Sequence, residues 1–160
     1  MKKNLGKIIN CVSILLALVA ILMMFAPAIS YKTDKIDGIT GVQVAFGKKD
    51  ALSASAYMLS YLLTIVGIAL AVLALLGKGG KIVPLAAAVC FIAAAICFFL
   101  PMVMVTNYVG KLEGAAKDKA IESYREILKQ TAQIGAGAIV GGILSILAGA
   151  AVAVPVFLKK

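Results

Sequence analysis

The chain has 160 residues, 62% of them hydrophobic and only 14% charged, with a mean hydropathy of +1.05. Soluble domains are about half apolar and about a quarter charged, so this is not the composition of a soluble domain. The formal net charge is +9. No basic face is interleaved with aromatic residues, and we therefore expect no binding to nucleic acid.

Four uncharged runs dominate the sequence, and each exceeds the about 20 apolar residues that a helix needs to cross a bilayer. We predict an all-α membrane protein, a single domain that folds as an antiparallel four-helix transmembrane bundle. The spans are predicted at about 6–29, 52–76, 83–107 and 131–156. They leave a short inner turn and two outer loops, 30–51 and 108–130.

The first span follows Lys2, Lys3 and Lys7 and ends in Ala26-Pro27-Ala28, a pattern that secretory signal peptides share. Its apolar run is longer than the about 7–15 residues typical of a signal peptide. We therefore predict a helix that is retained over the whole span. Cleavage after the small residues stays as the alternative.

The first outer loop carries apolar residues with strand-like spacing, punctuated by Gly38, Gly41 and Gly47. The stretch from Thr40 to Phe46 partly alternates between apolar residues and small or polar ones. This pattern favours a small β-hairpin-like element, or a three-stranded sheet, lying on the outer ends of the helices.

The second span is predicted to begin after Asp50, a residue type that caps helix N-termini, and to end at Gly77, a type that ends helices. The turn from Gly77 to Lys81 is so short that the second and third spans must form an antiparallel hairpin. Pro84 suits the first turn of the third span. Pro101 is expected to kink that helix near its outer end.

The second outer loop is rich in helix-forming residues from Ala115 to Gln133, with an apolar stripe at helical spacing. No glycine or proline interrupts this pattern before Gly135. We predict a helical second outer loop that either continues straight into the fourth span or lies flat on the bilayer. The fourth span should end near Pro155.

The charges sort by loop and predict the orientation. The N-terminus, the inner turn and the C-terminus hold seven lysines and no acids, whereas all seven acids lie in the two outer loops. Short cytoplasmic segments are enriched in Lys and Arg, so both termini should be cytoplasmic in a multi-pass protein of the plasma (inner) membrane. Four tyrosines should lie near the outer boundary, where such rings prefer to sit: Tyr31, Tyr57, Tyr61 and Tyr108.

Small residues recur at every fourth position of the fourth span and form one strip: Gly137, Gly141, Ser145, Gly149 and Ala153. Such strips let helix backbones approach closely in lipid. The strip therefore predicts helix packing inside the bundle. Alternatively, it forms a face for self-association or for a membrane-protein partner.

Polar residues gather in the outer half of the predicted bundle: Tyr57, Ser60, Thr64, Asn107 and Gln133. They could line an outward-facing pocket or vestibule. The alternative, which we favour, is hydrogen bonding between helices. Asn10 and Ser13 are expected to form such bonds near the inner end of the first span.

Several absences bear on function. The chain has no histidine and three cysteines, Cys11, Cys90 and Cys97, which all fall inside predicted spans, so we expect no metal site and no cofactor. Apart from Lys7 at the very start of the first span, no span carries an ionisable Asp, Glu, Lys or Arg, which ion-coupled transporters usually need at depth. No catalytic motif is found, so we expect no enzyme and no catalytic residues.

Four spans, cytoplasmic ends, a β-like first outer loop and a tight inner turn resemble the claudin-type tetraspan architecture. The resemblance covers the whole chain as topology. The family's first-loop signature is a Trp, a Gly-Leu-Trp and a cysteine pair, whereas this chain has no Trp and carries Gly38-Ile39-Thr40-Gly41-Val42 there. The resemblance thus implies a fold and not barrier or pore formation. The Lys-rich start and small size look more like those of small bacterial membrane proteins.

From these patterns we expect a non-enzymatic structural, accessory or partner-binding protein. Its partners would be the lipid bilayer and either a second copy of the chain or another membrane protein. The alternative is a channel or small-solute transporter subunit that uses the outer polar residues.

Overall fold

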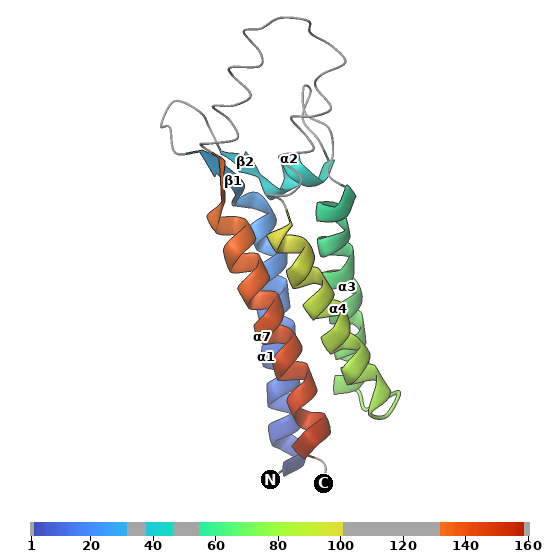
Figure 1. Cartoon of the computed structure of the whole chain (residues 1–160). Coiled ribbons are helices and arrows are strands. Elements are labelled where there is room, and N and C mark those ends of the chain that lie inside the picture. Colours follow the sequence, from blue (N-terminus) through green and yellow to red (C-terminus); the bar gives the residue numbers. More distant parts are fainter. Residues whose placement is uncertain (1, 32–37, 47–54, 101–131, 159–160) are drawn as a thin grey trace, which may run out of the picture.

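A computed structural model describes residues 2–31, 38–46, 55–100 and 132–158. This part of the chain is mostly helical, and four of its helices are long and apolar enough to cross a membrane. They are α1 (Lys2–Leu22), α3 (Ser55–Leu75), α4 (Ile82–Phe99) and α7 (Ala136–Leu158). Both chain ends lie at one end of the molecule together with the α3–α4 turn (Figure 1), and we call this the turn end.

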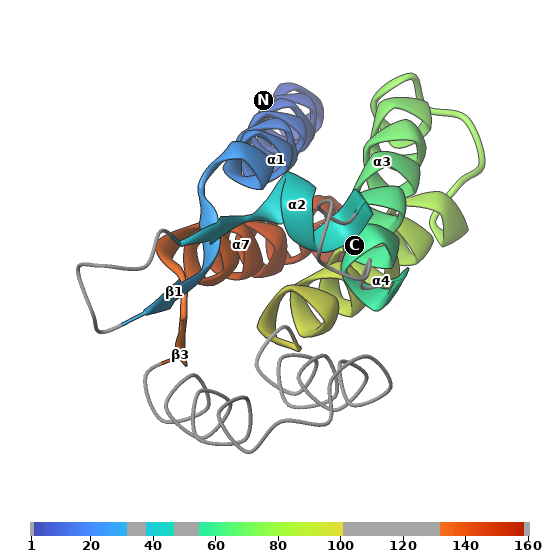
Figure 2. The ribbon, with the colours of Figure 1, turned by 90° about the horizontal axis from the view of Figure 1, so that it is seen from above.

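A small sheet and the short helix α2 (Gly41–Phe46) lie at the opposite end, which we call the sheet end. Helix α1 contacts α3 and α7, and α4 contacts the same two helices. Figure 2 shows this arrangement from the sheet end, with α2 lying across the ends of the long helices.

Small residues fill the spaces between the long helices. The buried apolar residues there are mostly alanines: Ala17, Ala20, Ala71, Ala87, Ala88, Ala94, Ala95, Ala138 and Ala148. Large aliphatic residues are instead exposed on every long helix, among them Leu15, Leu18, Ile65, Val66, Ile92, Ile96, Ile143 and Ile146. Small residues therefore let the helices approach closely, and the buried rings of Phe91 and Phe98 pack against glycines of the neighbouring helices.

Helix α3 ends where the sequence predicts, just before Gly77. The Lys78 N–H donates to the Leu73 carbonyl oxygen at 3.0 Å, and the Gly77 N–H donates to the Ala74 carbonyl oxygen at 3.1 Å. This pair of bonds is a Schellman motif, which needs the positive φ of 75° that Gly77 adopts. The motif turns the chain directly into α4, whose first turn contains the buried Pro84.

The first span is shorter than predicted as a helix. Helix α1 ends at Leu22, a 3₁₀ turn (η1, Met23–Phe25) follows, and β1 (Pro27–Tyr31) is a strand. The prediction of helix to residue 29 is wrong because Pro27 disfavours the helical conformation of the residue before it. Ala26 is indeed extended, with φ −83° and ψ 159°.

The sheet has three antiparallel strands in the order β2-β1-β3. Strand β2 is Ile39–Thr40 and β3 is Ala132–Ile134. A three-stranded sheet at this end was one of the predicted alternatives, but β3 and the first three residues of β1 come from outside the predicted first outer loop. Ile29 pairs with Ile134 and Ser30 with Gln133, so the sheet joins the ends of the first and fourth spans.

Strand β3 also shows that the second outer loop does not continue as a helix into the fourth span. A helix running through Gln133 into the fourth span is wrong, because Ala132–Ile134 is extended and α7 begins only at Ala136. Gly135 turns the chain here, and its N–H donates to the Ala28 carbonyl oxygen at 2.8 Å. The backbone of Pro27 leaves no room for a Cβ on Gly135. At its other end, α7 continues past Pro155 to Leu158.

Residues 41–46 form α2 and not the strand that their alternation suggested. Thr40 and Gln43 make a capping box: the Gln43 N–H donates to Thr40 Oγ1 at 3.4 Å, and the Thr40 N–H donates to Gln43 Oε1 at 3.2 Å. Gly41, Val44 and Ala45 form the buried face of this helix. Their spacing is helical, which the period-two interpretation overlooked.

Some predictions lie outside the described residues. These are the helix cap at Asp50, the kink at Pro101, the end of the third span from residue 101 and the second outer loop before Ala132.

Candidate functional site

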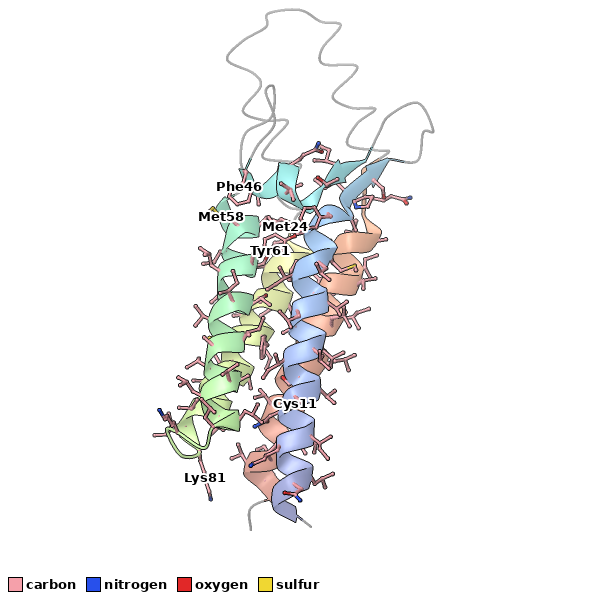
Figure 3. The ribbon with its side chains drawn as sticks, turned by 180° about the vertical axis from the view of Figure 1, so that it is seen from behind. Cys11, Met24, Phe46, Met58, Tyr61 and Lys81 are labelled. Atoms are coloured by element: carbon pink, nitrogen blue, oxygen red, sulfur yellow. The ribbon has the colours of Figure 1, made fainter. Side chains whose placement is uncertain are left out.

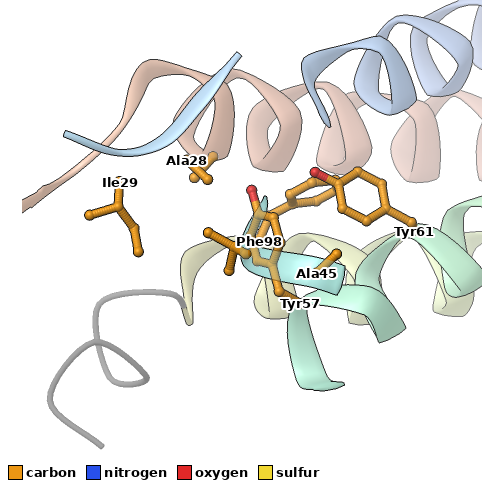
Figure 4. Packing of buried hydrophobic residues seen from close by; sticks show 8 residues of the cluster. Ala28, Ile29, Ala45, Tyr57, Tyr61 and Phe98 are labelled. Atoms are coloured by element: carbon orange, nitrogen blue, oxygen red, sulfur yellow. The ribbon is translucent and has the colours of Figure 1, made fainter. Parts of the chain in front are cut away.

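The best-defined cluster of side chains lies beneath α2 at the sheet end. Helix α2 contacts α3, η1 and β1. Its buried face covers an apolar cluster that α3, α4, α7 and β1 also build: Ala28, Ile29, Val44, Ala45, Tyr57, Tyr61, Phe98 and Ala138. We call this set the cap cluster (Figure 4). It buries three large aromatic rings together, and two of them carry hydroxyl groups.

Three aromatic rings form the centre of the cap cluster. Tyr57 and Tyr61 lie one helical turn apart on α3, with ring centroids 5.5 Å apart. Phe98 of α4 lies 5.7 Å from the Tyr57 ring and 5.2 Å from the Tyr61 ring. All three pairs are T-shaped, with interplanar angles of 82–90°. This geometry places the positive edge of one ring on the negative face of another, so the rings fix each other's positions.

The hydroxyls of Tyr57 and Tyr61 are buried inside this otherwise apolar cluster. Tyr57 is 0% exposed and Tyr61 is 5% exposed. Neither hydroxyl has a hydrogen-bond partner among the described residues. Both point from α3 toward the segment where α1 gives way to β1 (Figure 4). A buried hydroxyl without a partner costs about 1–3 kcal/mol, so these two groups are the polar atoms of the cap cluster that most need a partner.

Gly41 brings the α2 backbone against Tyr61. A Cβ on Gly41 would overlap the Tyr61 hydroxyl and would lie 2.9 Å from the Met24 carbonyl oxygen. The backbone N–H of Gly41 donates to the Ala26 carbonyl oxygen at 3.2 Å. Figure 3 shows Met24 and Tyr61 next to each other below α2. The absence of a side chain at Gly41 is what lets α2 close over the two tyrosines.

The predicted outer polar residues are only partly brought together. Tyr57, Ser60 and Thr64 share the buried face of α3. The Ser60 hydroxyl donates to the Tyr57 carbonyl oxygen at 2.6 Å, and the Thr64 hydroxyl donates to the Ser60 carbonyl oxygen at 2.8 Å. The hydroxyls of Ser60 and Thr64 are thus bonded within their own helix and not to another helix. Gln133 is exposed on β3, and Asn107 lies outside the described residues.

The small-residue strip of α7 is packed within the chain. Cβ atoms on two of its glycines would lie 3.1–3.3 Å from α4: Gly141 faces Phe98, and Gly149 faces Phe91 and the Ala88 carbonyl oxygen. Gly137 faces η1, with the Met23 carbonyl oxygen 2.9 Å from a Cβ placed there.

The remaining two members of the strip are also engaged. Ser145 is buried, and its hydroxyl donates to the Gly141 carbonyl oxygen at 2.9 Å. Ala153 packs against a second buried cluster between the long helices. Four members of the strip are therefore buried within the described chain, and Ala153 is half-buried.

Helices α1 and α7 share a buried polar contact nearer the turn end. The Ser13 hydroxyl donates to the Ala148 carbonyl oxygen at 2.7 Å, which is the interhelical bond expected for this residue. Asn10 is also buried, but its Oδ1 has no partner among the described residues. Cys11, labelled in Figure 3, is exposed on α1, and Cys90 and Cys97 are half-buried free thiols on α4.

Sequence reasoning missed Tyr61, Gly41 and Phe98 as members of one site. The spacing of Tyr57, Tyr61 and Thr64 is helical and places both tyrosines on one face. Gly41 could have been found from the capping-box pattern Thr40-x-x-Gln43, which starts a helix at that residue.

Comparison with known proteins found no family model that matches this chain, and no curated protein or solved structure that matches it. The claudin-type topology therefore stays a prediction from the sequence.

Proposed function

We propose that this chain is an integral membrane protein whose four long helices cross the bilayer as an antiparallel bundle. The distribution of side-chain size carries this proposal: alanines lie between the helices and large aliphatic residues lie on the outside. In water, each exposed apolar Å² would cost about 25 cal/mol. In lipid no such cost arises, and small interfacial residues let the helices approach closely.

The orientation is supported by charge. Lys7, Lys78 and Lys81 are exposed, and all three belong to the turn end, where both chain termini lie (Figure 1). The two predicted outer loops hold nine basic residues spread over more than 40 positions, whereas the N-terminus, the inner turn and the C-terminus hold seven lysines within about 14 positions. By the positive-inside rule the turn end faces the cytoplasm, and the sheet end faces outward from a plasma (inner) membrane.

We assign the chain a non-enzymatic role as an accessory protein that binds a membrane partner through its sheet end. The small-residue strip supports the choice of the sheet end, because glycines of the strip already pack against α4 and η1 of the same chain. Among the described residues of the sheet end, α2 and the sheet form the surface that would lie outside the lipid and could meet a partner. Phe46 at the end of α2 is 60% exposed there, and a capping box fixes the start of that helix.

Photo-crosslinking in native membranes tests this role. A photoreactive amino acid at Phe46 should give one discrete crosslinked product, either a dimer of this chain or one heterologous protein. The matched control is Ile143, which is 48% exposed on the side of α7 and should crosslink mainly to lipid. Equal product patterns from both positions, or no protein product from Phe46, would reject the sheet end as a binding surface.

The alternative is a channel or small-solute transporter subunit. The buried and unpartnered hydroxyls of Tyr57 and Tyr61 favour it, because they offer polar groups to a solute that enters from the sheet end. Solute flux through proteoliposomes that contain only this chain would support the alternative, and a bare accessory protein should give none.

A further inference from the structure

The turn between α3 and α4 presents two lysines to the surroundings of the turn end. Lys78 and Lys81 are both exposed, and the Lys81 side chain extends from the turn away from the sheet end (Figure 3). None of the described residues is an aspartate or a glutamate. The countercharge of these two ammonium groups must therefore come from outside the described part of the chain.

Exposed apolar residues flank the turn on both sides. Leu76, just before Gly77, is 64% exposed, and Ile82, the first residue of α4, is 78% exposed. In the proposed bundle these two residues lie at the ends of lipid-facing helices, where the hydrocarbon meets the headgroups. Lysines at such a boundary lay their methylene stems along apolar surface and extend their ammonium groups to the headgroups. The turn therefore presents its charges at the depth of the lipid headgroups.

The backbone of the turn leaves the space around the lysines open. Gly79 and Gly80 adopt positive φ values of 83° and 61°, which continue the reversal that Gly77 begins. A Cβ built on Gly77 or on Gly80 would meet no atom within 4 Å. A group as large as a lipid headgroup therefore has access to the turn.

We infer that the turn from Gly77 to Lys81 binds an anionic phospholipid of the cytoplasmic leaflet. Lys78 and Lys81 bind the negative headgroup, and Leu76 and Ile82 contact the acyl chains. A free anion would neutralise the lysines but would leave the two exposed apolar residues without a partner, so charge and apolar surface together favour a lipid. The inference rests on the proposed transmembrane arrangement.

Tryptophan quenching in lipid bilayers tests the site, because the chain has no Trp of its own. Leu76→Trp places one indole beside the turn. The matched control is Phe25→Trp, at a residue near the sheet end that is 71% exposed. Each full-length variant is reconstituted in mixtures of phosphatidylcholine and phosphatidylglycerol, in which one lipid at a time carries brominated acyl chains. Bromine quenches an indole that its lipid touches, so the two quenching curves give the relative binding of the two lipids there.

Phosphatidylglycerol should bind beside the Leu76→Trp indole at least about fivefold more tightly than phosphatidylcholine, since one lysine near an anionic surface contributes about 1 kcal/mol. The Phe25→Trp indole should show no preference. Lys78→Gln together with Lys81→Gln should abolish the preference at position 76, whereas Lys7→Gln removes a charge from α1 at the same end and should leave it unchanged.

Two results would overturn the lipid site and leave the membrane arrangement intact. One is equal quenching at position 76 by the two brominated lipids. The other is a loss of preference from Lys7→Gln as large as that from the two turn substitutions, because the attraction would then belong to the whole end of the molecule. If neither brominated lipid quenched either indole, the transmembrane arrangement itself would be rejected, and the inference with it.

Discussion

Gly41 and Tyr61 lie so close together that no side chain fits on the glycine. A Cβ there would overlap the tyrosine hydroxyl and would lie 2.9 Å from the carbonyl oxygen and 3.1 Å from the Cα of Met24. Gly41→Ala should therefore lift α2 and destabilise the protein by about 1–3 kcal/mol, as overpacking does elsewhere. Thermal unfolding in detergent measures this loss.

Two further variants show whether contact with Tyr61 causes this loss of stability. Tyr61→Phe removes the overlapping oxygen and should restore part of the stability that Gly41→Ala loses. The rest of the loss, which comes from contact with Met24, should remain. Gly6→Ala is the control, since a Cβ there would lie 3.5 Å from Pro155 in ordinary contact, and alanine favours helix over glycine. If Gly41→Ala proved as stable as Gly6→Ala, the close approach would be refuted.

The capping box should decide whether α2 forms. Thr40→Ala removes Oγ1, the acceptor of the Gln43 N–H, and loss of such a cap costs about 0.5–2 kcal/mol. A membrane-impermeant thiol reagent should then modify a cysteine placed at Ala45 faster, because a frayed α2 no longer holds this position against the cap cluster. Thr40→Ser keeps the hydroxyl and should leave the labelling rate near that of the parent. Equal rates for the Ala and Ser variants would mean that the box contributes nothing to the position of α2.

The small-residue strip should matter for folding of the single chain. Gly149→Leu forces a large side chain against α4, where the Ala88 carbonyl oxygen and Phe91 Cβ would each lie 3.3 Å from its Cβ. We expect a loss of at least about 1–3 kcal/mol, seen as a lower unfolding temperature. Ala150→Leu, on the exposed neighbouring position, should be tolerated. A variant at Gly149 that kept its stability but lost crosslinked oligomers would show that the strip binds a second chain instead.

The Ser13 hydroxyl joins α1 to α7 by one hydrogen bond, and its removal should have a smaller effect on stability. Ser13→Ala removes its bond to the Ala148 carbonyl oxygen and should cost about 0.6 kcal/mol, the average for interhelical bonds in membranes. Ser145→Ala is the comparison, because that hydroxyl bonds only within its own helix and its loss should change stability less. The difference in unfolding free energy between the two variants is the quantity to measure.

The long helices could be predicted from the sequence because their signal is strong and local. Uncharged runs give their number, and Gly77 gives the end of α3 through a positive φ that other residues rarely adopt. The sheet could not be predicted in the same way. Strand β1 lies at the end of a long apolar run whose composition predicts a helix, and only Pro27 indicates otherwise. Its partner β3 lies about a hundred residues away in the sequence.

The candidate site was predictable only in part, because it forms through contacts between distant segments. Tyr57, Ser60 and Thr64 could be placed on one face of α3 from their spacing. Nothing local indicated that Ser60 and Thr64 would bond to their own backbone, or that Phe98 would join Tyr57 and Tyr61. The alternation of residues 40–46 predicts a strand, but a pattern over only seven residues fits one buried face of a helix equally well, and residues 41–46 form α2.

We propose that the four helices cross a membrane with the turn end inside the cell. Cysteine labelling in intact cells tests this orientation, with single cysteines at Phe46 on the sheet end and at Lys78 in the α3–α4 turn of a Cys-free chain. An impermeant maleimide should label Phe46→Cys from outside and should reach Lys78→Cys only after permeabilisation. Labelling of both from outside, the reverse pattern, or a chain that remains in the soluble fraction without detergent would contradict it.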